Sequence, residues 1–238
     1  MDQLEAQLDM EQYLQALQAL FSQHADPVKA VPMKKYMRNQ FEFLGIKSPE
    51  HTRLFKQFVA EHGLPTVAQL EPLILTLWQW PEREYQYLAL SFLRRLRSQL
   101  APAIAPTIET LIVEKSWWDT IDSLASHTVG DLYTRYPQEM AVYITRWRSH
   151  SNFWLRRTTL LFQLGYKSKT DEALLFSLVR ENLGSKEFFI NKAIGWALRE
   201  YSKTAPTAVQ QFVETTELAS LSRREALKWM KTHPDKLS

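Results

Sequence analysis

The chain has 238 residues, 45% of them hydrophobic, which is enough to bury a sizeable core. The absence of cysteine excludes disulfides, thiolate chemistry and cysteine metal sites, and fits a reducing compartment. The acidic, amphipathic start at residues 1–5 is not typical of a signal or transit peptide, and no apolar run approaches the roughly 18 residues of a membrane span. We therefore expect a soluble, cytoplasmic protein with no membrane partner.

Charge is unevenly distributed, although the formal net charge is only +3. Residues 1–26 contain acids but no Lys or Arg, whereas residues 28–60 are rich in Lys and Arg. Short arginine clusters follow at 94–97, 146–148, 156–157 and 223–224. Such clusters favour a polyanion-binding surface, but each is also compatible with a solvated helix face.

The pattern predicts an all-α chain, because glycine is scarce and neither sustained strand alternation nor a hairpin turn signal occurs. Proline and glycine separate the expected helices. These helices cover residues 3–23, 32–38, 49–61, 67–78, 82–99, 104–113, 117–125, 129–135, 138–149, 153–164, 171–182, 186–202, 207–214 and 223–231.

Helix pairs recur about every 35–40 residues without a strict sequence repeat, which favours a HEAT-like solenoid over a single bundle. Such a solenoid is curved and presents a concave face. No low-complexity linker interrupts the chain, so we predict one domain over residues 1–238, with the acidic first helix as an end cap.

The first candidate binding segment is the loop at residues 39–49, in which apolar residues surround a glycine before a Ser-Pro helix start. It is either a packed connector or a loop that presents Tyr36, Arg38 and Lys47 to a ligand.

The segment Ser116–Asp122 (SWWDTID) concentrates two tryptophans and two carboxylates. With Ser116 as N-cap, Asp119 lies in the first turn, where capping accounts for it. Trp117 begins an apolar stripe, whereas Trp118 and Asp122 share a neighbouring face. These two are either a boundary tryptophan beside a solvated acid or part of a site.

In the helix at 153–164, Arg157 falls on an apolar face, where a charge requires a partner. Asp122 is a candidate partner, and such a pair would keep Asp122 ionised at neutral pH. Another acid could instead pair with Arg157 for structural reasons alone.

In the helix at 186–202, Trp196 lies off the predicted core stripe and shares its face with Phe189 and three cations. Cations around an aromatic ring suit a ligand that combines phosphate with a sugar or base. A neighbouring helix that covers Trp196 is the alternative. The three cations are Lys192, Arg199 and Lys203.

Other chemistries find little support. No glycine-rich phosphate loop occurs, and the histidines lack metal-ligand spacing, so we expect no metal and no cofactor. Ser-His-Asp catalysis stays open, although nothing points to it.

Four segments together resemble the AlkD-type DNA alkylation repair enzymes, which are HEAT-like repeat DNA glycosylases. They are PMKKYMRNQFEFLGI at 32–46, SWWDTID at 116–122, LRRT at 155–158 and FFINKAIGWALREY at 188–201, in the order of the family and dispersed over nearly the whole chain.

The resemblance implies a solenoid that holds duplex DNA in a concave cationic groove and excises N3- and N7-alkylated purines, with the lesion left largely stacked. Asp122 matches the catalytic aspartate of the family, and Trp118 and Trp196 match the tryptophans that flank the damaged nucleotide. Tyr36, Arg157 and Arg199 match positions near the site or the DNA. Some relatives lack the catalytic set and are not glycosylases.

We therefore expect a monomeric glycosylase whose partner is double-stranded DNA containing alkylated purines. A non-catalytic helical-repeat protein that binds DNA or RNA, and a protein–protein scaffold, are the alternatives. An excision assay on methylated DNA, combined with a salt titration of binding, separates the three.

Overall fold

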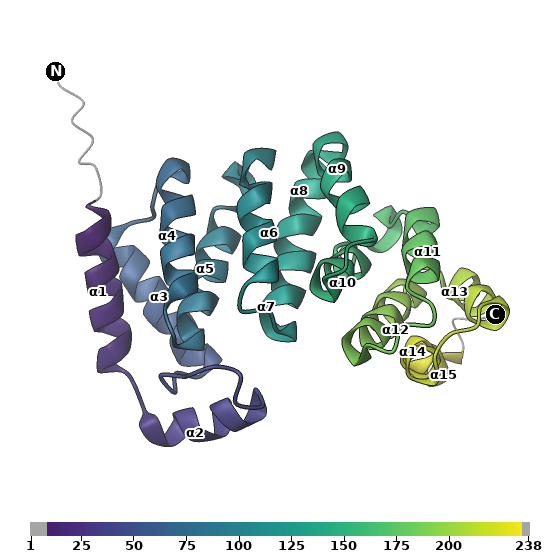
Figure 1. The fold of residues 1–238 in the computed structure, drawn as a ribbon, viewed down its shortest axis with the longest axis horizontal. Helices are drawn as coiled ribbons and strands as arrows, with labels where there is room; N and C mark the ends of the chain where they lie inside the picture. Colours follow the sequence, from purple (N-terminus) through teal and green to yellow (C-terminus); the bar gives the residue numbers. More distant parts are fainter. Residues whose placement is uncertain (1–8, 235–238) are drawn as a thin grey trace. The chain divides into compact units, whose positions relative to one another are not determined.

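The computed structural model describes residues 9–234, and all regular elements in this range are helical, apart from one isolated bridge between Glu42 and Glu82. The all-α prediction is therefore confirmed. Contacts divide the chain into two compact units, Met1–Leu100 and Ala101–Ser238, and each is described by itself (Figure 1). The curved solenoid, its concave groove and the single domain stay predictions.

Within residues 9–100, the first unit is built from five α-helices and a short 3-10 turn. They are α1 (Met10–Gln23), α2 (Pro27–Tyr36), α3 (Ser48–His62), α4 (Val67–Gln79), α5 (Arg83–Arg95) and η1 (Arg97–Gln99). Helix α1 packs on α3 and α4, and α5 packs on α3 and α4. The apolar stripes meet in a core that includes Leu17, Phe21, Phe58, Trp78 and Phe92, each fully buried. Residues 3–8 of the predicted first helix lie outside the described range.

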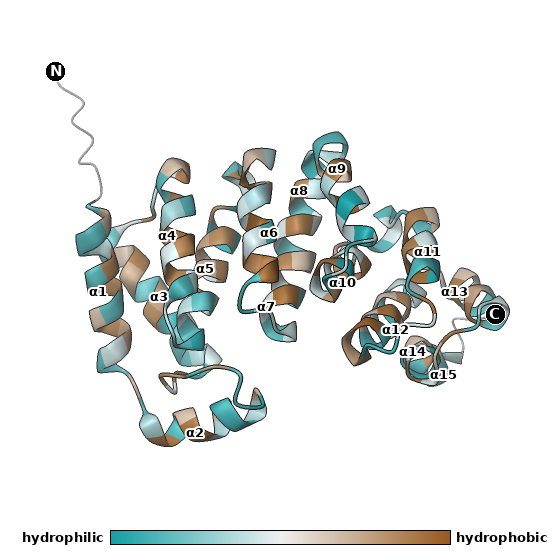
Figure 2. Cartoon of the chain, in the orientation of Figure 1, coloured by the Kyte–Doolittle hydropathy of each residue, from teal (hydrophilic) through white to brown (hydrophobic). Residues whose placement is uncertain are grey.

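Helix α2 begins five residues earlier than predicted, because Pro27 starts the helix instead of separating two helices. The Asp26 carboxylate accepts hydrogen bonds from the backbone N–H groups of Val28 and Lys29, at 3.0 and 3.1 Å, and Pro27 needs no such partner. No residue of α2 is buried. Its hydrophobic residues, visible in Figure 2, therefore stay at the surface, with Val28 82% and Val31 68% exposed.

A buried carboxylate organises the loop between α2 and α3. Glu84 of α5 is fully buried and accepts hydrogen bonds from the backbone N–H groups of Leu44, Gly45 and Ile46, at 3.0, 2.9 and 3.0 Å. Gly45 has φ +93°, and a Cβ there would lie 2.1 Å from the backbone oxygen of Asp26. The loop is thus a packed connector.

The second unit contains the remaining helices, and α12 is its centre. Helix α12 packs against α10, α13, α14 and α15. The elements are η2 (Pro102–Ile104), α6 (Ala105–Val113), α7 (Trp118–Ser123), a π-helix η3 (Leu124–Val129), α8 (Gly130–Arg135), α9 (Pro137–Arg148), α10 (Phe153–Leu161), η4 (Lys167–Lys169), α11 (Glu172–Glu181), α12 (Phe188–Ser202), α13 (Pro206–Thr215), α14 (Ser220–Ala226) and α15 (Lys228–Thr232). The predicted last helix at 223–231 is therefore two helices, and the first of them begins at Ser220.

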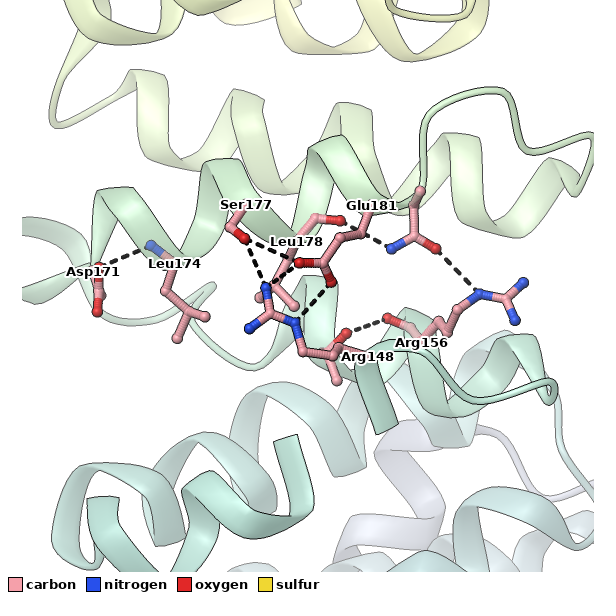
Figure 3. Close-up of polar contacts among 9 residues, drawn as sticks. Arg148, Arg156, Asp171, Leu174, Ser177, Leu178 and Glu181 are labelled. Atoms are coloured by element: carbon pink, nitrogen blue, oxygen red, sulfur yellow. Dashed lines mark hydrogen bonds and ion pairs between the residues drawn. The ribbon is translucent and has the colours of Figure 1, made fainter. Parts of the chain in front are cut away.

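Hydrogen bonds and an ion pair connect α11 to the end of α9 and to α10 (Figure 3). The Arg148 Nε donates to Glu181 Oε2 at 2.7 Å, and Arg148 Nη2 donates to Ser177 Oγ at 2.7 Å. Arg156 Nε donates to Asn182 Oδ1 at 3.2 Å. Arginines 148 and 156, which belong to predicted polyanion-binding clusters, therefore hold neighbouring helices together. None of the helices in residues 9–234 combines the length and the apolar character needed to cross a membrane.

Candidate active site

Helix α7 begins one residue later than predicted, at Trp118 and not at Trp117. Trp117, not Ser116, is the N-cap, with extended backbone at φ −156° and ψ 160°. The Ser116 hydroxyl instead donates to the backbone oxygen of Ile112 at the end of α6, at 2.6 Å. Asp119 remains in the first turn, where its charge suits the helix dipole. The predicted Ser116 cap is therefore wrong, because the hydroxyl serves the preceding helix.

Asp122 and Arg157 form a bidentate ion pair. Arg157 Nε donates to Asp122 Oδ1 at 2.8 Å, and Arg157 Nη2 donates to Asp122 Oδ2 at 3.0 Å. The side chains are 4% exposed for Arg157 and 16% for Asp122. Arg157 Nη1 also donates to the backbone oxygen of Phe189 in α12. The predicted pair is present, and it joins α7, α10 and α12.

Burial governs the protonation of Asp122 more strongly than its partner does. Desolvation raises the pKa of the Asp122 carboxyl above its ordinary value, although the Arg157 guanidinium acts in the opposite direction and Asp119 adds to the increase. Pairing with Arg157 by itself predicts only that the Asp122 anion is stabilised, which would lower the pKa of its carboxyl. The structure adds a desolvation effect that spacing along a sequence does not reveal.

A π-helix begins at Leu124, two residues after Asp122, and covers the position where the sequence predicted a break between two helices. Helix α7 continues through η3 into α8, and the Ser126 hydroxyl donates to the backbone oxygen of Asp122 at 2.7 Å. Gly130 does not end a helix. It lets α8 approach the turn after α10, where a Cβ would lie 2.4 Å from the Phe162 backbone oxygen. Single π turns inside α-helices are frequent at functional sites.

The two adjacent tryptophans have different surroundings. The Trp117 ring packs against Phe189 and Trp154, with centroids 5.1 and 6.1 Å apart, so it belongs to an aromatic cluster between α7, α10 and α12. The Trp118 ring lies at a cleft with Asp122. The predicted inward position of Trp117 agrees with this cluster, whereas a ligand-facing role of Trp118 stays a prediction.

We call this cleft the aspartate cleft. Its volume is about 400 Å³, and it brings together residues from α7, α10, α12 and α14. All three predicted catalytic residues and three predicted DNA-binding residues line it. The lining is Trp118, Asp122, Arg157, Phe188, Phe189, Lys192, Trp196, Arg199 and Glu225. A second cleft, also of about 400 Å³, shares Asp122 and Trp196 with it.

An acid that sequence reasoning missed faces the cations of the aspartate cleft. Glu225 of α14 lies 2.8 Å from Arg199 and 3.3 Å from Lys192, measured between the charged atoms, and is 15% exposed. Burial alone would raise its pKa, but Lys192, Arg199 and Lys228 together hold the pKa of Glu225 below its ordinary value. No sequence motif marks Glu225; the available signal is Gly195 within α12, since a glycine inside a helix is compatible with close approach of another helix.

Gly195 allows α14 to pack closely against α12. A Cβ at Gly195 would lie 2.5 Å from the Glu225 Cβ and 2.9 Å from the Ser222 backbone oxygen. The Ser222 hydroxyl in turn donates to the Asn191 backbone oxygen at 2.9 Å. The contact places the Glu225 carboxylate against α12, beside the cleft.

The remaining predicted binding residues lie elsewhere. Lys203 pairs with Glu200 at 2.6 Å and lines a different pocket, with Tyr201. Tyr201 is half-buried, and its hydroxyl donates to Glu172 Oε2 at 2.9 Å.

Three predicted DNA-binding residues, Tyr36, Arg38 and Lys47, belong to the first unit. All are exposed, and Arg38 has φ +54°. They stand around the loop that Glu84 holds, so the packed connector also fixes the backbone that carries them. Across residues 9–234, no group of three or more His, Cys, Asp or Glu side chains is arranged to hold a metal ion.

Comparison with known proteins agrees with this architecture. The family model of the DNA alkylation repair enzyme matches residues 17–230. A solved structure described as a predicted DNA alkylation repair enzyme from Enterococcus faecalis is similar, with a TM-score of 0.80 and 34% sequence identity, covering 87% of this chain and 96% of that one. No curated protein matches.

Proposed function

The chain belongs to the DNA alkylation repair enzyme family, and from this premise we propose that it is a DNA glycosylase for cationic N3- and N7-alkylated purines in duplex DNA. The observation that carries the proposal is the largely buried carboxylate of Asp122, held by Arg157 in a cleft that Trp118 and Trp196 also line. In this proposal the protein acts as a monomer, which is the simplest way to engage a duplex, and it leaves the base unflipped, as the resemblance implies.

The chemistry requires little beyond one oriented carboxylate. An N3- or N7-alkylated purine is already positively charged, so it leaves without protonation, and positive charge develops on the sugar, as in glycoside hydrolysis. The anionic Asp122 stabilises this oxocarbenium-like sugar and positions the attacking water. Arg157 fixes the carboxylate through two hydrogen bonds, so little reorganisation is needed during the reaction.

The tryptophan rings and the cations of the aspartate cleft have separate proposed roles. The faces of Trp118 and Trp196 attract the developing positive charge. Lys192 and Arg199, on the same cleft, supply contacts for the phosphodiester backbone. The site thus works from the backbone side of the duplex, which fits a lesion that stays stacked.

The test is Asp122→Asn, assayed by release of 7-methylguanine from methylated duplex DNA. We expect the variant to fold and bind DNA but to lose excision by about 100-fold or more. Asp119→Asn is the matched control, since it removes the same charge from the same helix, and it should keep most activity. Wild-type excision by Asp122→Asn would overturn the proposal, whereas DNA binding without excision by the wild type would favour the non-catalytic alternative.

A further inference from the structure

The cations of the aspartate cleft are already occupied in the unbound protein. The two oxygens of Glu225 contact Arg199 and Lys192 separately, at 2.8 and 3.3 Å, so one carboxylate bridges two cations. A phosphodiester group offers the same pattern, with two anionic oxygens for an Arg–Lys pair. Glu225 therefore stands where a DNA phosphate would bind.

This carboxylate is held in place by the backbone. Helix α14 is pressed on α12 at Gly195, close to the Glu225 Cβ itself, and the Ser222–Asn191 hydrogen bond fixes the preceding turn. The side chains are partly shielded, with exposures of 15% for Glu225, 25% for Arg199 and 38% for Lys192. A charge pair this shielded is less screened by salt than one on an open surface.

The charges that line the cleft are consequently nearly balanced. Arg157 is paired with Asp122, and the two other cations share Glu225. A duplex phosphate that approaches Arg199 must displace or share the carboxylate, and it meets two negative groups in the same cleft. Binding of unmodified backbone is therefore opposed, whereas a cationic lesion is attracted by the same two acids.

We infer that Glu225 is a specificity-determining residue that competes with DNA phosphate for Lys192 and Arg199 and so limits binding of undamaged duplex. The inference rests on the proposed function for its ligand. It assigns to Glu225 a role in discrimination and leaves the chemistry to Asp122.

The experiment measures the Kd of the full chain for an unmodified DNA duplex over a range of salt concentrations. Glu225→Gln should bind about tenfold more tightly than wild type, the scale of one added charge-assisted hydrogen bond, and the slope of log Kd against log salt should steepen by about 0.9. The matched control is Glu214→Gln, which removes the same charge from an exposed position of α13, where Gln210 Nε2 donates to Glu214 Oε1 at 2.9 Å. It should change Kd and slope little.

A second variant separates the loss of the bridging contact from the loss of the Glu225 charge. It also tests the inference if Glu225→Gln does not unfold cooperatively on heating. Glu225→Asp keeps the charge but is one methylene too short to bridge both cations, so it should bind the duplex more tightly than wild type and less tightly than Glu225→Gln. Binding by Glu225→Gln no tighter than by Glu214→Gln, or by Glu225→Asp no tighter than by wild type, overturns the inference.

A failure of the proposed function can be distinguished from a failure of the Glu225 inference. Salt-dependent duplex binding without release of 7-methylguanine would overturn the glycosylase and leave Glu225 to be judged on binding. An absence of duplex binding by wild type would overturn both.

Discussion

At the scale of single residues, the raised pKa of Asp122 predicts how activity and stability depend on pH. Because the proposed excision uses the Asp122 anion and burial raises the pKa of this carboxyl, activity should fall with decreasing pH at a higher pH than an ordinary aspartate, with a pKa of about 3.9, would give. The same shift acts on stability. The folded state holds this proton more tightly than the unfolded state, so the contribution to stability falls as pH rises from the ordinary pKa through the raised one.

Replacing Arg157 tests the pair. Arg157→Gln removes the group that lowers the Asp122 pKa, so the acidic limb of the pH–rate profile should move to higher pH. It also leaves a buried carboxylate without its cation, which costs about 3–5 kcal/mol of unfolding free energy. Arg135→Gln, which breaks the more exposed pair with Asp131, should cost less than about 1 kcal/mol in urea denaturation. An unmoved acidic limb would contradict the assignment of that limb to Asp122.

The adjacent tryptophans allow a second residue-scale test. Trp118→Ala should reduce excision of 7-methylguanine more than it reduces stability, because its ring lines the cleft. Trp117→Ala opens the aromatic cluster with Trp154 and Phe189 and should cost about 3–5 kcal/mol, measured by urea denaturation. If both variants lose stability equally while Trp118→Ala keeps full activity, the proposed role of Trp118 is wrong.

At the scale of elements, glycines that permit close contact matter more than glycines that end helices. Gly195→Ala should push α14 from α12 and cost about 1–3 kcal/mol in urea denaturation, because the new methyl group meets the Glu225 Cβ and the Ser222 backbone. Gly165→Ala is the matched control, since a Cβ there meets nothing within 4 Å, and it should be neutral or slightly stabilising. Equal stability of the two variants would contradict this prediction and show that α12 and α14 can move apart to accommodate the methyl group at little cost.

The elements also show how far the sequence determines the structure. Helical periodicity predicted the class and most helix positions, because apolar spacing and proline at the first turn are local signals. The start of α2 differs from the prediction, because Pro27 follows the Asp26 cap and begins the helix, whereas proline usually marks a break. The pair of Asp122 and Arg157 was predictable, since a charge on an apolar face requires a partner. Glu225 was not, because its place depends on the packing of α14.

At the scale of the whole molecule, the prediction concerns salt. A chain with a sequence pI of about 9.0 that contacts several phosphates should bind duplex DNA less tightly as salt increases, by about 0.9 in the log–log slope for each contact. The double variant Arg38→Gln, Lys47→Gln should lower this slope by up to about 1.8 if both contact phosphate. Arg53→Gln with Lys56→Gln, in α3, is a control of equal charge. Equal slopes for both pairs would remove Arg38 and Lys47 from the proposed interface.

The π-helix after Asp122 has a consequence for the evolution of the chain. In η3 the Gly130 backbone N–H donates to the Ala125 oxygen, five residues back, so the segment holds one residue more than an α-helix of the same rise. Loss of any one residue from Leu124–Val129 would restore the α-helix and rotate Asp122 by about 100° relative to α8. Arg157 would then face a different side of α7. Insertions and deletions in homologues should therefore avoid this segment, and its length should serve as an alignment marker for relatives that keep the aspartate in place.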